Sequence, residues 1–244
     1  MIELSDLTKS YGKNRAVDGL NLSIPDGELF GFIGPNGAGK TTTIQMIGGL
    51  LAPTSGKVLI DDIDISENPV AVKKMIGLIP DRPFLYEKLT GTEFLRFTAD
   101  LFEVDHKSFN RKSNELLNLF GLQSRADELI EAYSHGMKQR LVMTAALLHD
   151  PRILIVDEPM VGLDPRGIKM VRSLFRRLAD TGVTIFMSTH TLSLAEEICD
   201  RIGIINNGKL IATGTIGELK GAVRMGQVNL EQAFLELTQE QAMQ

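Results

Sequence analysis

Residues 34–41 are the segment of this sequence whose composition most clearly suggests chemistry. They read Gly-Pro-Asn-Gly-Ala-Gly-Lys-Thr and follow the apolar stretch Glu28–Ile33. Glycines let a loop curl so that successive backbone N–H groups point at phosphate oxygens, and a helix that begins directly after the loop adds partial positive charge. The pattern predicts a loop that binds the phosphates of a nucleoside triphosphate.

The polar residues of this loop have separate expected tasks. Lys40 is expected to contact the β- and γ-phosphates, the Thr41 hydroxyl to ligate Mg²⁺, and Thr42 is a further candidate for a phosphate contact. The other candidates for nucleotide binding in the loop are Asn36, Gly37, Ala38 and Gly39. The alternative is a glycine-rich turn before a helix, which would match this pattern by chance in roughly one chain in a hundred.

Two carboxylates follow a second apolar segment, Ile153–Val156. Ligands of α/β sheets bind at the carboxyl ends of the strands, where Asp157 and Glu158 would lie. Asp157 is expected to hold Mg²⁺, directly or through water, and Glu158 to act as general base on an attacking water. A strand that ends in a polar turn is the alternative, and the intact phosphate loop favours the catalytic interpretation.

A second helix start has an unusual charge pattern. Ser134 can act as the N-cap of a helix that continues through Leu141 and Leu148, whereas Lys138 opposes the dipole in the first turn. A helix whose first turn carries a cation, where an acidic residue would be favoured, is a candidate anion site. An ordinary capped helix is the alternative.

Alternating strands and helices must position these groups, which predicts a parallel α/β sheet covered on both faces. Strands are expected at Ile2–Thr8, Leu20–Ile24, Glu28–Ile33, Lys57–Ile60, Met75–Ile79, Ile153–Val156, Thr184–Met187 and Ile202–Ile205. Helices are expected at Gly39–Leu51, Pro165–Ala179, Leu192–Cys199 and Asn229–Gln239, and a mostly helical region from Phe84 to His149. The expected division is a core of residues 1–84 and 150–220, a helical subdomain of residues 85–149 and a helical tail of residues 221–244.

Together the motifs resemble those of the nucleotide-binding subunits of ABC transporters. Tyr133–Met137 stands in the place of that family's signature, Val161–Asp164 in the place of its D-loop and Met187–His190 in the place of its switch histidine. The resemblance covers nearly the whole chain. It implies a P-loop NTPase (RecA-like) core with an N-terminal antiparallel β-subdomain and an inserted helical subdomain, and an ATPase that uses Mg²⁺.

The resemblance also assigns roles to single residues. Tyr11 matches the aromatic that stacks on adenine, and Val17 matches the apolar contact near the ribose. His190 would polarise the γ-phosphate or the attacking water, acting with Glu158 and Lys40 as the catalytic group. Asp164 of the D-loop is a further candidate for the nucleotide site.

Ser134 and Gly136 match the signature positions that contact ATP bound to the opposite subunit. One chain carries one phosphate loop and one signature, so two chains are expected to meet head to tail with two ATP molecules between them. Homodimer and heterodimer both suit this motif set.

Two motifs depart from the family pattern. Residues 133–137 read Tyr-Ser-His-Gly-Met where the family signature usually reads Leu-Ser-Gly-Gly-Gln, although Ser134 and Gly136 are kept. Asp81 stands where the family has the glutamine of its Q-loop. A carboxylate can accept from water or ligate Mg²⁺ but cannot donate to a phosphate oxygen. Asp81 is therefore an additional candidate Mg²⁺ ligand, and its presence puts the usual coupling of Mg²⁺ to the partner in doubt.

The segments Leu85–Glu93 and Asn229–Thr238 resemble the branch that exports drugs, antibiotics, lipids or polysaccharides. Subunits of this kind dock on a separate membrane permease through the helical subdomain. The implied location is the cytoplasmic face of a membrane, held there by the permease.

Composition limits the other functions. The 244 residues carry 26 Lys and Arg against 31 Asp and Glu, a net charge of −5 that disfavours non-specific nucleic-acid binding. No apolar run reaches the length of a membrane span, the N-terminus has no signal-peptide pattern, and Cys199 is the single cysteine, so the protein is expected to be soluble inside the cell.

Two alternative functions remain. A soluble ATPase of the same type that acts on nucleic acid or ribosomes usually carries two nucleotide domains, a coiled coil or zinc-binding cysteines, none of which this sequence contains. A non-hydrolysing regulatory module is disfavoured by Glu158 and His190. The helical stripe Arg166, Lys169, Arg172 and Arg176 could approach anionic lipid, but a solvated helix face is favoured.

Overall fold

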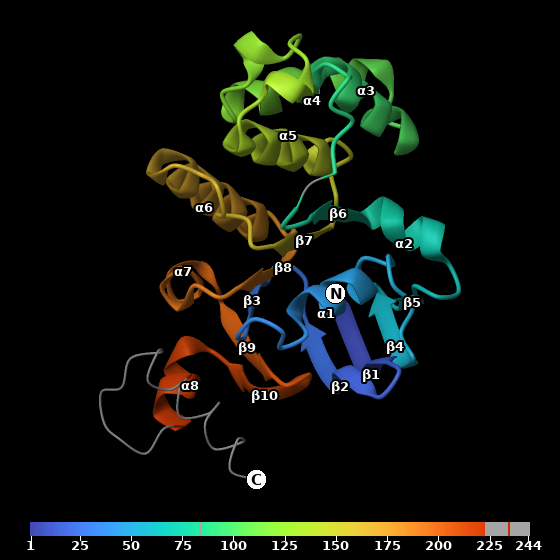
Figure 1. Ribbon diagram of the computed structural model, residues 1–244, viewed down its shortest axis with the longest axis vertical. Helices are drawn as coiled ribbons and strands as arrows, with labels where there is room; N and C mark the ends of the chain where they lie inside the picture. The colour runs from blue at the N-terminus through green and yellow to red at the C-terminus, as the bar shows by residue number, and fades with distance from the viewer. Residues whose placement is uncertain (83, 223–233, 235–244) are drawn as a thin grey trace.

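Two β-sheets and a helix between them form the centre of the protein (Figure 1). The computed structural model describes residues 1–82, 84–222 and Phe234. The larger sheet has the strand order β10-β9-β3-β8-β7-β6, and its strands are parallel except for β10, which runs antiparallel to β9. These strands are β3 (Leu29–Ile33), β6 (Ile76–Ile79), β7 (Ile153–Asp157), β8 (Thr184–Thr189), β9 (Arg201–Asn206) and β10 (Lys209–Gly214).

The smaller sheet is antiparallel and has the order β2-β1-β4-β5. Its strands are β1 (Ile2–Tyr11), β2 (Asn14–Ile24), β4 (Ser55–Ile60) and β5 (Ile63–Asp64). Helix α1 (Lys40–Ile47) touches both β2 and the central strands β7 and β8, so it lies between the two sheets. The start of α1 is thereby fixed from both sides.

The central strands are apolar because both of their faces are covered. Every residue of β3, β7 and β8 is buried. On the face toward the smaller sheet, the ring of Phe186 lies 5.9 Å from that of Phe30 and 5.2 Å from that of Phe32. On the other face pack α6 (Pro165–Asp180) and α7 (Leu192–Ile198). The carboxyl ends of the strands are thus held rigidly in one row.

A helical lobe extends from the sheet end that carries β6 and β7 (Figure 1). It contains α3 (Gly91–Leu101), α4 (His106–Leu119), α5 (His135–Leu147) and two short 3₁₀ turns, Gln123–Arg125 and Ile130–Ala132. The start of α3 is closed by a capping box in which Thr90 and Glu93 satisfy each other's backbone N–H groups. The remaining helices are α2 (Pro69–Met75) and α8 (Ile216–Ala222).

The expected fold class is confirmed, with its antiparallel β-subdomain and its helical region. Four elements were not expected from the sequence, namely α2, β5, the edge strand β10 and α8. The expected helix Asn229–Gln239 lies outside the described residues apart from Phe234, which is partly buried against the core. Within the described residues, no helix combines the length and the apolar character needed to cross a bilayer.

Candidate functional site

The glycine-rich loop of residues 34–39 joins β3 to α1 at the carboxyl end of the larger sheet. Gly37 and Gly39 have φ angles of +80° and +109°, a region that favours glycine. A Cβ atom at Gly39 would lie 2.5 Å from the carbonyl oxygen of Ala16, and one at Gly34 would collide with that of Ile205. The loop therefore packs against the backbone of its neighbours and needs glycine at these positions.

The first turn of α1 can receive an anion. Its N-cap is Gly39, which gives the helix no side-chain cap, and the turn contains no acidic residue. The first backbone N–H groups of a helix have no partner within the helix and carry partial positive charge. An anionic group at this end would satisfy both.

Lys40 is a buried cation at the same place. Its Nζ donates to the carbonyl oxygens of Gly34 at 2.7 Å and Pro35 at 3.1 Å. Burial lowers the pKa of Lys40, while the nearby carboxylates of Glu158 and Asp157 act in the opposite direction. A polyanionic ligand would favour the charged ammonium in this pocket.

Asp157 is buried at the end of β7 and is held by two hydroxyl groups. Thr41 donates its Oγ1 hydrogen to Oδ2 at 3.0 Å, and Ser188 donates to Oδ1. The parallel register of β7 and β8 places Asp157 opposite Ser188. The Thr41 hydroxyl and the Asp157 carboxylate offer neighbouring hard oxygens, the kind of donor that Mg²⁺ takes from protein beside phosphate and water. The residues present fit a magnesium ion.

Glu158 follows in a left-handed backbone conformation, with φ of +48°. Its Oε1 lies 2.7 Å from Nδ1 of His190, which requires that nitrogen to carry the proton, and its Oε2 accepts from Thr189 Oγ1 at 3.3 Å. The Glu158 amide donates to the Ser188 carbonyl at 3.2 Å. Side chain and backbone are therefore both fixed, at a φ that is uncommon outside glycine and recurs at functional sites.

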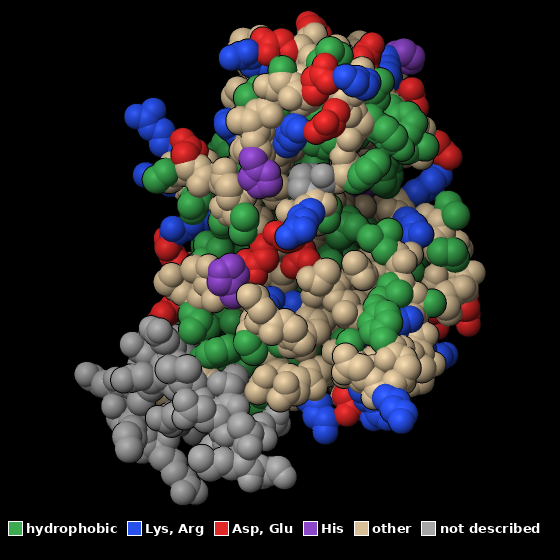
Figure 2. Space-filling view, viewed as in Figure 1, with side chains coloured by type: hydrophobic (Ala, Val, Ile, Leu, Met, Phe, Trp, Pro, Cys, Tyr) green, Lys and Arg blue, Asp and Glu red, His purple; other side chains and the backbone are tan. Residues whose placement is uncertain are grey.

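These groups surround one pocket of about 240 Å³. Figure 2 shows acidic side chains gathered in a hollow midway along this face, below the helical lobe. The pocket is lined by Ala16, Asn36, Gly37, Gly39, Lys40, Thr41, Thr42, Asp81, Asp157 and Glu158. Asp81 thus adds a third carboxylate to the pocket that contains Lys40. Ala38, also expected here, is buried in the loop.

Tyr11 and Val17, which were expected near the base and the ribose, differ in their exposure to solvent. Tyr11 ends β1 and is half exposed, with the ammonium of Lys9 5.6 Å from its ring centre. Val17 is fully buried in the core between the sheets, whereas its neighbour Ala16 lines the pocket. The expectation for Val17 is therefore corrected, because its side chain offers a ligand no surface.

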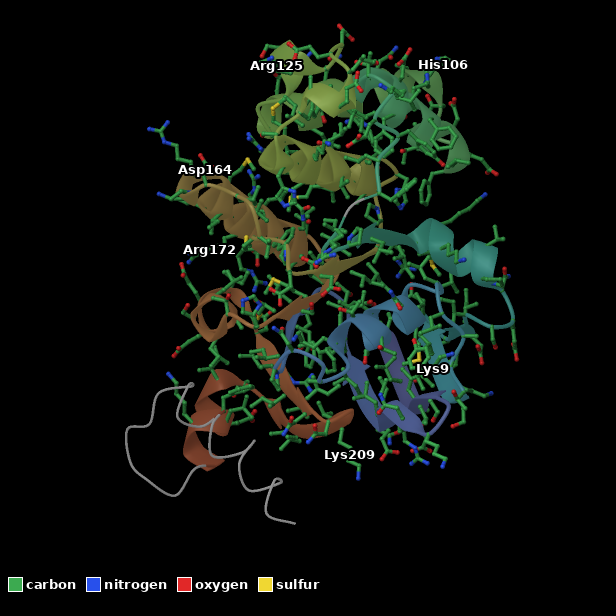
Figure 3. All side chains as sticks on the ribbon, viewed as in Figure 1. Lys9, His106, Arg125, Asp164, Arg172 and Lys209 are labelled. Atoms are coloured by element: carbon green, nitrogen blue, oxygen red, sulfur yellow. The ribbon has the colours of Figure 1, made fainter. Side chains whose placement is uncertain are left out.

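A second group of expected residues lies away from this pocket. Ser134 caps α5 by accepting from the Met137 amide at 3.3 Å, and Gly136 lies in the first turn of the same helix. Asp164 caps α6 by accepting from the Gly167 amide at 2.9 Å, and Figure 3 shows it at the start of that helix. None of these three residues lines the pocket around Lys40.

Ser188 is a site residue that the sequence alone did not single out. The motif that contains it was assigned for its histidine, yet its hydroxyl is one of the two donors that hold Asp157. The only signal was its place two residues before His190 in the strand next to β7.

The basic stripe on α6 is partly neutralised. Arg172, labelled in Figure 3, pairs with Glu197, and Arg176 pairs with Asp180 at 2.9 Å and Asp200 at 2.8 Å. Arg166 and Lys169 make no ion pair with the residues that the structure describes. This distribution is typical of a solvated helix face.

Comparisons with known proteins agree with this geometry. The family model described as ABC transporter matches residues 17–161. The linearmycin resistance ATP-binding protein LnrL of Bacillus subtilis (strain 168) is 40% identical over 90% of this chain and 70% of its own length. The bacitracin transport ATP-binding protein BcrA of Bacillus licheniformis is 43% identical over 90% of this chain and 71% of its own.

Two solved structures extend the comparison to three dimensions. One is the ATP-binding subunit of an ABC transporter, with a TM-score of 0.93, 33% identity, and coverage of 98% of this chain and 99% of that one. The other is a bacterial ABC transporter cassette solved as a dimer, with a TM-score of 0.80, 27% identity, and coverage of 88% and 98%.

Proposed function

The chain belongs to the ABC transporter family as an ATP-binding subunit, and from this premise we propose that it hydrolyses ATP with Mg²⁺ to drive a separate membrane permease. The observation that carries the proposal is the grouping of a buried lysine, a hydroxyl-held aspartate and a histidine-held glutamate around one glycine-rich loop.

The phosphate loop provides the charge that binding requires. The uncapped amides of α1 and the Lys40 ammonium would take the β- and γ-phosphates, with Asn36 and Thr42 at the rim of the same pocket. Thr41 and Asp157 would hold Mg²⁺, which when bound neutralises charge on the phosphate oxygens. Asp81 is proposed as a further oxygen near the ion, directly or through water.

Glu158 is proposed as the general base. Its carboxylate would take a proton from the attacking water, because the bonds from His190 and Thr189 fix its orientation. His190 is 59% exposed at its side chain, which leaves the imidazole accessible to a γ-phosphate. The buried Lys40 ammonium would stabilise the negative charge that the attacking water gains when it loses its proton.

Two subunits are proposed to complete two sites. Ser134 and Gly136 lie away from the pocket of their own chain, so their ligand would be ATP held by a second subunit. The related cassette solved as a dimer supports this arrangement. The second subunit can be another copy or a related chain, since one motif set serves both.

A groove of about 360 Å³ beside the helical lobe is proposed to receive a cytoplasmic helix of the permease. Its lining is mainly apolar and includes Leu78, Phe94 and Phe102, and the ring of Phe84 at its edge is 82% exposed. Contiguous exposed apolar surface marks an interaction site. Docking there would hold the subunit on the cytoplasmic face of a membrane. An exporter of antibiotics is the proposed transporter, since relatives carry linearmycin resistance and bacitracin transport in their names.

Two variants test the proposal. Lys40→Ala should lose ATP affinity and turnover, whereas Glu158→Gln should bind ATP, lose turnover and accumulate as a dimer. Lys169→Ala, which removes an exposed lysine on α6, is the matched control. A folded Lys40→Ala protein that keeps its ATP affinity and turnover, or a Glu158→Gln protein that stays monomeric at saturating ATP and Mg²⁺, would contradict it. Isolation from native membranes should recover a polytopic partner, while recovery with ribosomes would favour the soluble alternative.

A further inference from the structure

His135, the first residue of α5, packs directly on the loop that precedes α6. A Cβ atom at Gly162 would collide with Cδ2 of the His135 ring and would lie 2.7 Å from its Nε2. Gly162 also has φ of +79°, so two independent constraints require glycine there. The imidazole therefore occupies the space above Gly162 that any other residue would fill.

The next residue of α5 strengthens this contact. A Cβ atom at Gly136 would lie 3.0 Å from the carbonyl oxygen of Gly162 and 4.0 Å from Cδ2 of Leu163. Arg140 Nε donates to the Gly136 carbonyl at 3.1 Å, which fixes the first turn of the helix. Because residues 136 and 162 are both glycines, the backbone at the start of α5 can pack directly against the loop at Gly162.

The same loop is tied to the proposed general base. The Val161 amide donates to the Glu158 carbonyl at 3.2 Å, and the Leu163 amide donates to the Met160 carbonyl at 3.3 Å. Asp164 then caps α6. Gly162 lies four residues from Glu158, and two consecutive turns connect them. Because so little flexible chain separates the two residues, a displacement of Gly162 should also move Glu158.

We propose that His135 is a positioning residue that couples the start of α5 to Glu158 through Gly162. This inference rests on the proposed function, in which Ser134 and Gly136 receive ATP from a second subunit. Engagement of that ATP shifts the start of α5, the imidazole transmits the shift to Gly162, and the turns carry it to the carboxylate. Each ATP thereby sets the geometry of Glu158 in the subunit that contributes the signature.

The coupling acts through packing. Within the part of the chain that the structure describes, the exposed His135 side chain makes no hydrogen bond through its ring nitrogens, while the ring edge lies against Gly162. A flat ring without nitrogen should therefore preserve the coupling, and a small side chain should not. Direct contact of the imidazole with phosphate is the competing role, which requires the nitrogen.

The test compares His135→Ala with His135→Phe in the full-length chain. His135→Ala should lower kcat about tenfold and leave KM for ATP within about twofold, as expected for contacting residues that act as a unit. His135→Phe should restore kcat to within about twofold of the parent. His106→Ala is the control, since His106 is the first residue of α4 in the same lobe and lies outside the pocket around Lys40. Equal loss in both His135 variants, or none in His135→Ala, would overturn the proposal.

Hydrogen exchange supplies a readout that does not depend on hydrolysis. In the nucleotide-free chain, the amides of Val161 and Leu163 should exchange about tenfold faster in His135→Ala than in the parent or in His135→Phe. Unchanged exchange in His135→Ala would overturn the coupling even if the parent is an active ATPase. If the parent chain showed no ATP turnover, the proposed function would be contradicted. The exchange result would still show whether His135 stabilises the turns at Val161 and Leu163.

A crossed variant addresses the steric argument. Gly162→Ala should impair kcat because the new methyl group forces the His135 ring away. In the double variant His135→Ala/Gly162→Ala the methyl group has room, so its kcat should exceed that of Gly162→Ala alone. Independent, multiplicative losses would overturn the contact as the origin of the effect.

Discussion

Removal of the Ser188 hydroxyl isolates the part of the site that orients Asp157. Ser188→Ala deletes one of the two side-chain donors to this buried carboxylate and leaves the β7–β8 pairing intact, because that pairing uses backbone groups. The other donor, Thr41 Oγ1 at 3.0 Å from Oδ2, remains. The Asp157 side chain should stay at the end of β7, but the rotation of its carboxylate group should no longer be fixed by two hydrogen bonds.

The size of the effect follows from these two bonds. A hydrogen bond to a charged group contributes about 1.5–3 kcal/mol, and the retained Thr41 bond places the loss in unfolding free energy near the lower end, about 1.5 kcal/mol. Loss of a group that orients a metal ligand weakens metal binding about 10–100-fold. With one of the two donors left, we expect the apparent Mg²⁺ dissociation constant to rise about tenfold.

The assay is a Mg²⁺ titration of ATP turnover at saturating ATP, together with urea unfolding. Ser188→Ala should shift the Mg²⁺ midpoint and lower kcat at saturating Mg²⁺ by no more than about twofold. Ser113→Ala is the matched control, because Ser113 is also buried but donates only to the Asn110 carbonyl within α4. An unchanged midpoint in a folded Ser188→Ala protein would refute the role given to this hydroxyl.

Two further predictions concern the glycines of the phosphate loop and the buried carboxyl group of Glu28. Gly39→Ala should weaken ATP binding, measured by calorimetry, more than Gly37→Ala, because both incur about 1–2 kcal/mol of left-handed strain but only residue 39 also meets Ala16 at 2.5 Å; equal losses would contradict this. Burial raises the pKa of Glu28 above its ordinary 4.5 despite the Arg201 partner. The folded protein therefore keeps this proton to higher pH than the unfolded chain, and the contribution to stability is present below the ordinary pKa and lost as pH rises through the raised pKa. The unfolding free energy of the parent minus that of Glu28→Gln should therefore fall as the pH rises from 4.5 through the raised pKa, and a rise would reverse the assignment.

The members of the pocket could be predicted because their spacing is local. A loop of six residues between β3 and α1 can place Lys40 and Thr41 in only a few ways, and a carboxylate at the end of a buried strand lies at the ligand edge of the sheet. The absence of an acidic residue from the first turn of α1 does not by itself mark an anion site. Helices α2, α4, α5, α6 and α7 share that feature. What distinguishes α1 from these helices is a glycine at the N-cap, since Gly39 has no side chain that could cap the helix.

Groups that depend on strand register could not be predicted. The bond from Ser188 to Asp157 joins residues 31 positions apart and exists because β7 and β8 pair in one particular register. The pairing of β1 with β2 contains register shifts on both sides of the Lys9–Val17 pair. A bulge changes which residues face inward, so the sequence could not tell that Ala16, and not Val17, reaches the pocket.

The start of α5 allows helix capping to be separated from ligand binding. Ser134 Oγ accepts from the Met137 amide at 3.3 Å, and a hydroxyl that accepts can still donate its hydrogen to a phosphate. Asp caps a helix about as well as Ser but has no hydrogen to donate and would oppose a phosphate with negative charge. Ser134→Asp should therefore retain the unfolding free energy of the parent to within about 0.5 kcal/mol. ATP binding to the monomer should also persist, because Ser134 lies outside the pocket around Lys40. ATP-dependent dimer formation, measured by sedimentation, should be lost, and an Asp variant that dimerises like the parent would show that this helix start receives no phosphate from a second subunit.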